Sequence, residues 1–163
     1  MQNICVYCAS SSKIDSKYVE TAKRLGSLLA ENNMQLVYGG GSVGLMGILA
    51  DSVLDKGGKV TGIIPKFMVE AEWQHDGLTK LILTETMHER KEKMAAMSNA
   101  VVALPGGCGT LEELLEVITW KQLGIYRNPI IIVNVDGYYN HLLAQFQQAA
   151  DELFMRPQHL DMW

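Results

Sequence analysis

The sequence predicts an α/β fold, a doubly wound and mostly parallel sheet with helices on both of its faces. Two observations predict it. Short runs rich in Ile, Val and Leu alternate with longer amphipathic stretches along the whole chain, which is typical of a parallel sheet covered on both sides. The 163 residues also contain no linker, repeat or low-complexity tract, so we expect one domain over residues 1–163.

Each expected strand is a short apolar run, and each expected helix is a stretch whose apolar residues recur at helical spacing. The first strand, 3–9, precedes the first helix, 16–32. The second strand, 35–38, leads through a glycine-rich turn into the helix 44–56. The remaining elements are expected as strands at 59–64 and 80–84, a helix at 87–98, a strand at 100–104, a helix at 111–123, a strand at 129–133 and a helix at 138–153.

The unusual residues of the sequence gather where the expected strands end. Ligands of open α/β sheets bind outside the carboxyl ends of the strands, near the point where the strand order reverses. Three serines, 10–12, follow the first strand, and a glycine-rich segment, 39–44, follows the second. The charged segment 85–91 and the loop 105–110 (Pro-Gly-Gly-Cys-Gly-Thr) follow two later strands. We therefore expect a binding site at this edge of the sheet.

Composition excludes several classes of protein. Hydrophobic residues make up 48% and charged residues 20% of the chain, which excludes intrinsic disorder. A formal net charge of -4 argues against nucleic acid as a partner, because phosphate backbones require a basic surface. No apolar run approaches the ~20 residues that cross a bilayer, and the N-terminus has no basic segment typical of a signal peptide. Three cysteines fit a reducing compartment, so we expect a cytoplasmic protein without membrane contact.

Neither the cysteines nor the histidines predict a metal or redox site. Cys5 and Cys8 have the C-x-x-C spacing, but both fall inside the first expected strand rather than at a helix start, where the thiol pKa would be lowered. Their spacing directs them to opposite faces of that strand, which favours two buried thiols over a redox pair. The four histidines are scattered and match no zinc spacing, so we expect no metal.

The first glycine loop, Gly39-x-Gly41-x-x-Gly44, matches the spacing of a dinucleotide-binding loop. It follows the second strand rather than the first, and the next strand carries no acid to hold a ribose, so a dinucleotide site loses most of its support. The loop also lacks the lysine of a nucleoside-triphosphate loop. We expect Gly40, Gly41 and Ser42 to contact the ligand; the alternative is a turn that only allows close packing of strand and helix.

The second glycine loop, 105–110, runs directly into a helix. Glycines let the backbone approach a ligand, and a helix start offers unpaired N–H groups and a favourable dipole to a phosphate. The acids at the start of this helix, Glu112 and Glu113, would then serve sugar hydroxyls or water. The alternative for Glu113 is structural, since Thr110-x-x-Glu113 has the pattern of a capping box.

The helix 87–98 carries a charge within its apolar stripe. At 100° per residue, Met87, Arg90, Met94 and Met97 share one face, with Lys91 beside it. An arginine in an apolar stripe needs a partner, and its planar group suits phosphate or carboxylate. A structural salt bridge or a side chain that reaches the surface is the ordinary alternative.

Together these segments resemble the LONELY GUY family of cytokinin-activating phosphoribohydrolases, once labelled lysine decarboxylases. The P-G-G-x-G-T-x-x-E element with an upstream Arg-Lys pair is highly specific. The similarity also includes 39–47, 116–124 and 134–139, and it covers nearly the whole chain. The resemblance has one departure: members of the family usually continue past Trp163 into a further strand and helix, so either this chain is shortened or its sheet edge is finished differently.

The resemblance implies a Rossmann-like fold and hydrolysis of the N-glycosidic bond of adenosine 5′-monophosphate, often with an isoprenoid group on the base. Carried over by motif, Arg90 and Glu113 match the catalytic pair, with no cofactor required. A homodimer is implied as well, and Trp120 is either an interface anchor or a core residue. The further substrate-binding positions implied are Glu72, Lys91, Gly107, Cys108, Gly109, Thr110, Leu111, Glu112 and Thr119.

Two other functions compete with hydrolysis. A carrier of the same architecture, similar to molybdenum-cofactor carriers, would need the glycine loops but not the pair Arg90 and Glu113. A pyridoxal phosphate decarboxylase would need a Schiff-base lysine and a partner for the pyridine nitrogen, and the sequence offers no such setting.

Overall fold

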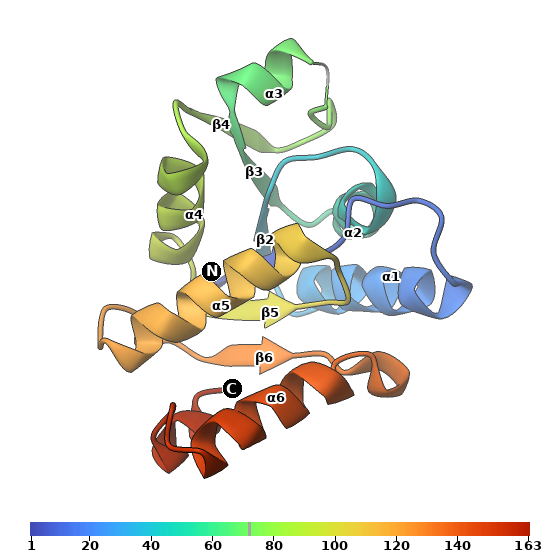
Figure 1. The fold of residues 1–163 in the computed structure, drawn as a ribbon. Helices are drawn as coiled ribbons and strands as arrows, with labels where there is room; N and C mark the ends of the chain where they lie inside the picture. The colour runs from blue at the N-terminus through green and yellow to red at the C-terminus, as the bar shows by residue number, and fades with distance from the viewer. Residues whose placement is uncertain (72) are drawn as a thin grey trace.

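The computed structural model describes residues 1–71 and 73–163. Within them, six parallel strands form one sheet in the order β4-β3-β2-β1-β5-β6, and helices cover both of its faces (Figure 1). This arrangement confirms the predicted doubly wound α/β fold. The strands are β1 (Asn3–Tyr7), β2 (Gln35–Tyr38), β3 (Val60–Pro65), β4 (Lys80–Thr84), β5 (Ala100–Ala103) and β6 (Ile130–Ile132). The helices are α1 (Ser16–Glu31), α2 (Gly44–Leu54), α3 (Lys66–Glu70), α4 (Met87–Ala96), α5 (Cys108–Gln122) and α6 (Asn140–Asp151).

The strand order reverses beside β1. The chain builds β1 to β4 outward in one direction, and α4 then returns it across the sheet so that β5 pairs with the free side of β1. Ile4 is consequently in register with Leu36 of β2 on one side and Ala100 of β5 on the other. The reversal places the ends of β1, β2 and β5 next to one another, which is where an open α/β sheet binds ligands.

Two apolar layers hold the sheet between its helices. Ile4, Val6 and Cys8 pack toward α1 and α2, whereas Cys5 and Tyr7 pack toward α4, α5 and α6. In Figure 1, α1 and α5 accordingly lie on opposite sides of β5. The two cysteines of the C-x-x-C pattern are buried and free on opposite faces, and burial raises the pKa of both thiols, so they do not form a redox pair.

The start of α5 differs from the expected one. The helix begins at Cys108, three residues before the predicted start, with Gly107 as its N-cap. Thr110 is therefore inside the helix, where its side chain fills the space beside Gly106, and it caps nothing. The structural alternative for Glu113, a capping box with Thr110, is therefore wrong, because a glycine N-cap has already started the helix upstream.

Candidate active site

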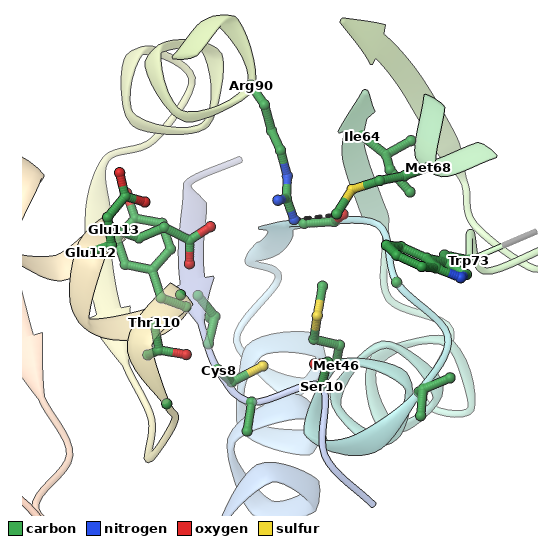
Figure 2. A pocket seen from close by; sticks show the side chains of 18 of the residues that line it. Cys8, Ser10, Met46, Ile64, Met68, Trp73, Arg90, Thr110, Glu112 and Glu113 are labelled. Carbon is green, nitrogen blue, oxygen red and sulfur yellow. Dashed lines mark hydrogen bonds between the residues drawn. The ribbon is translucent and has the colours of Figure 1, made fainter. Parts of the chain in front are cut away.

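A cavity of about 660 Å³ opens at the carboxyl ends of the central strands (Figure 2). Its walls come from the ends of β1 and β3, from the segments that follow β1, β2 and β3, from α4 and from the start of α5. Glu112, Glu113 and Thr110 lie on one side in Figure 2, Met46, Met68 and Trp73 lie on the other, and Arg90 extends between them. The cavity thus has a polar half and an apolar half.

Arg90 is held in the cavity wall by main-chain carbonyls. Thr86 caps α4 by accepting a hydrogen bond from the Glu89 N–H at 3.1 Å, and the arginine follows in the first turn. Its Nε donates to the carbonyl of Ile63 and its Nη2 to the carbonyl of Gly39, both at 3.0 Å. The residue is 7% exposed, and no carboxylate among the described residues pairs with it. A buried guanidinium without a counter-ion favours an anionic ligand.

Glu113 faces the same cavity from α5. Its burial raises the pKa of the carboxyl to about 7, and the nearby Arg90 cation opposes that rise. Near neutral pH the side chain therefore exists in both protonation states. A carboxyl with such a pKa can accept or hold a proton during a reaction, which an ordinary surface glutamate does less effectively.

The loop before α5 presents backbone donors. The first intrahelical bond recorded there runs from the Leu111 N–H to the Gly107 carbonyl, so the N–H groups of 107–110 precede the hydrogen-bonded turns. A Cβ added to Gly107 or Gly109 would meet no atom within 4 Å, so both glycines border open space. Free N–H groups at the positive end of a 15-residue helix are suited to a phosphate.

The apolar half depends on a bridge between two loops. The segment after α3 crosses the first glycine loop through an antiparallel bridge between Gly41 and Gln74. The Ser42 N–H donates to the Trp73 carbonyl at 3.1 Å, and the His75 N–H donates to the Gly40 carbonyl at 2.9 Å. This bridge brings the indole into the cavity wall. The other apolar side chains in the cavity wall are Met46, Ile64, Met68, Met87 and Met94.

Most of the residues expected at the site line the cavity, but some do not. Those brought together are Arg90, Glu113, Gly107, Cys108, Gly109, Thr110, Glu112, Gly41 and Ser42. Gly40, Leu111 and Thr119 lie outside its walls, and Thr119 is on the exposed face of α5. Glu72 lies outside the described residues.

Lys91 is turned toward α5 rather than into the cavity. Its side chain is 4% exposed and forms ion pairs with Glu112 and, at 3.1 Å, with Glu116. These pairs neutralise one of the acids at the start of α5, so a ligand anion would meet less negative charge there than the sequence suggests.

Several residues of the cavity wall are not among those named individually as site residues from the sequence. Cys8 and Ser10 come from the end of β1, and Met46, Met68 and Trp73 come from the apolar half. The serine run after the first strand was a signal for the former, because it falls on the functional edge. No local pattern marks Met68 or Trp73.

Within residues 1–71 and 73–163, no three His, Cys, Asp or Glu side chains gather as a metal site would require. In the same part of the chain, no helix combines the length and the apolar character needed to cross a membrane.

The chain is similar to several known proteins in sequence and in fold. Residues 46–163 match the family model described as "Possible lysine decarboxylase". Two Arabidopsis thaliana proteins, named cytokinin riboside 5′-monophosphate phosphoribohydrolase LOG7 and LOG3, are 50% and 49% identical over 156 residues. The alignments cover 96% of this chain and 72% and 73% of those proteins. The molybdenum cofactor carrier protein of Chlamydomonas reinhardtii shares the fold, with a TM-score of 0.73 and 22% identity over 93% of this chain and 86% of that one.

Proposed function

The chain belongs to the LONELY GUY family, and on that premise we propose that it hydrolyses the N-glycosidic bond of adenosine 5′-monophosphate or of its N6-prenylated, cytokinin form. The products are the free base and ribose 5-phosphate. The relatives at 49–50% identity are named as phosphoribohydrolases, which supports the class of reaction. The substrate itself is argued from the cavity.

The proposal rests on two residues that line one cavity. Arg90 is buried and pairs with no carboxylate among the described residues, and the carboxyl pKa of Glu113 is raised. Cleavage of an N-glycoside passes through a transition state in which the sugar resembles an oxocarbenium ion. A carboxylate facing that sugar stabilises its positive charge or activates the attacking water. The guanidinium, fixed by two carbonyls, holds the phosphate or the departing purine without having to rearrange.

The two halves of the cavity fit the two ends of such a substrate. The free N–H groups at the start of α5 suit the 5′-phosphate, which leaves the ribose beside Glu113. The base then extends toward Met46, Met68 and Trp73, whose apolar and aromatic surfaces suit a purine with an isoprenoid group. A volume of about 660 Å³ is within the ordinary range for a site that binds one small molecule.

We also propose that the protein forms a homodimer. Leu115, Leu123 and Ile125 are 40%, 68% and 70% exposed on α5 and just after it, and Thr119 lies between the two leucines on the same helix face. Such a run of exposed apolar side chains supports an interface. Trp120 packs against the buried cluster beneath α5 instead, so it supports the core rather than the interface. A monomeric mass in light scattering at micromolar concentration would contradict the dimer.

One assay separates hydrolysis from the carrier alternative. Purified protein is incubated with AMP, N6-isopentenyl-AMP and the two nucleosides in the presence of EDTA, and free base is measured by chromatography. We expect base from the nucleotides and far less from the nucleosides. Arg90→Ala and Glu113→Gln should stop release, whereas Glu92→Gln, on the exposed face of α4, should not. A protein that binds nucleotide but releases no base from any of them would favour the carrier.

A further inference from the structure

The turn between β6 and α6 has a conformation that its sequence fixes closely. Asp136 and Gly137 both adopt left-handed backbone angles, with φ of 46° and 77°. The Asn134 side chain accepts the Tyr139 N–H and donates to the Asn140 side chain, both at 2.7 Å. Gly137 has a left-handed φ, and a Cβ there would lie 2.6 Å from the Asn140 amide that Asn134 binds, so the turn favours glycine at this position. A turn with so fixed a conformation also fixes the positions of the residues that follow it.

Two consecutive tyrosines follow the turn, and they bind the main chain in and just before the second glycine loop. The Tyr138 hydroxyl donates to the Gly106 carbonyl and the Tyr139 hydroxyl donates to the Leu104 carbonyl, each at 2.7 Å. The two rings meet edge to face with centroids 5.0 Å apart, and Tyr18 packs on Tyr138 in the same way at 5.6 Å. The hydroxyl positions are therefore set by packing as well as by the turn.

The Gly106 carbonyl and the Gly107 N–H belong to one peptide group. The described chain has no cis peptide bond, and in a trans peptide these two groups point in opposite directions. Tyr138 is not part of the cavity wall, whereas Gly107 is. A hydroxyl that draws the Gly106 carbonyl away from the cavity therefore turns the Gly107 N–H toward it. No acceptor among the described residues takes that N–H.

We propose that Tyr138 is a positioning residue for the substrate phosphate, acting by fixing the peptide group that aims the Gly107 N–H into the cavity. This inference rests on the proposed function, which places a phosphate at this loop. Tyr139 makes the same bond to a carbonyl that precedes Pro105, and proline has no N–H. The bond from Tyr138 therefore orients a peptide group whose N–H can donate, whereas the bond from Tyr139 orients a peptide group that has no N–H.

This asymmetry supplies the test, with Tyr138→Phe as the variant and Tyr139→Phe as its matched control. Both changes keep the ring, and Tyr138 is 42% exposed, so its variant retains the fold. For Tyr138→Phe we expect the nucleotide KM and the dissociation constant of ribose 5-phosphate to rise roughly three- to tenfold, the range of one hydrogen bond, with kcat within about twofold. For Tyr139→Phe we expect both constants to match the wild type, with any loss confined to Tm.

Calorimetric binding of ribose 5-phosphate tests the positioning role directly, whether or not the wild type turns over. An unchanged dissociation constant in Tyr138→Phe overturns the role, and so does an equal rise in both variants, which would indicate general support of the loop. A wild type that binds ribose 5-phosphate yet releases no base overturns the proposed function alone.

Discussion

Replacing Glu113 by glutamine separates the cost of burying its charge from its use in the reaction. The carboxyl pKa is about 7 in the folded protein, against an ordinary value of 4.5, because burial disfavours the charged form. Between these two pH values the folded state holds the proton more tightly than the unfolded chain does. Stability therefore falls as pH rises from 4.5 to 7, and the full loss is present above that range.

The size of that loss follows from the difference between the two pKa values. At about 1.36 kcal/mol per pH unit it reaches up to about 3 kcal/mol, an upper bound because the cavity admits solvent to the side chain. Glutamine resembles the protonated acid and carries no such loss. In a chain of this size the variant should melt up to roughly 6–10 °C above the wild type at pH 8, and near the wild-type Tm at pH 5.

The assay is Tm and kcat across pH 5–8 for wild type, Glu113→Gln and the exposed control Glu92→Gln. We expect the more stable variant to lose about 10²–10³-fold in kcat, and the wild-type kcat to rise with pH through about 7 as the carboxylate forms. A Tm difference equal at pH 5 and pH 8 would refute the burial argument. More than about a tenth of wild-type kcat in Glu113→Gln would refute the catalytic role.

Three further changes probe the surroundings of the site. Gly39→Ala would put a methyl group 1.9 Å from the Arg90 Nη2, so we expect a shifted guanidinium and a loss of about 10²-fold in kcat/KM. Lys91→Met removes two ion pairs and should lower the free energy of unfolding by about 1–2 kcal/mol in urea titrations. The expected loss is no larger because both glutamate partners reach solvent. A rise in KM without this loss would instead indicate that the Lys91 ammonium binds the substrate. Iodoacetamide should label exposed Cys108 by mass spectrometry and inactivate the protein, and ribose 5-phosphate should slow both effects.

The T-x-x-E pattern shows where sequence reasoning stops. It occurs at Thr86 to Glu89 and again at Thr110 to Glu113. In the first case the threonine caps α4 and accepts the Glu89 N–H. In the second case the helix begins earlier, after Gly107 as its N-cap, so Thr110 and Glu113 both lie inside α5 and the glutamate faces the cavity. The difference is set by the preceding glycines, which the local pattern does not include.

Arg90 illustrates what periodicity does and does not predict. Its place in the apolar stripe of α4 followed from helical spacing, and the structure confirms that Met87 and Met94 share the cavity with it. The oxygens that accept its hydrogen bonds are main-chain carbonyls, of Ile63 in β3 and of Gly39 just after β2. Every residue carries a carbonyl, so no sequence pattern marks these two. The strand ends, which depend on apolar runs alone, were accordingly predicted more closely than the contacts between them.

The central position of β1 has a consequence for how the chain is made. Ile4 pairs with Ala100, which leaves the ribosome 96 residues later, or roughly 5–20 s at 5–20 residues per second. During that interval one edge of β1 lacks its neighbour and is exposed to association with other nascent chains. The cavity needs Ser10 from the start of this interval and Glu113 from after its end. Newly made chains therefore gain their binding site only with the late, long-range closure of the sheet.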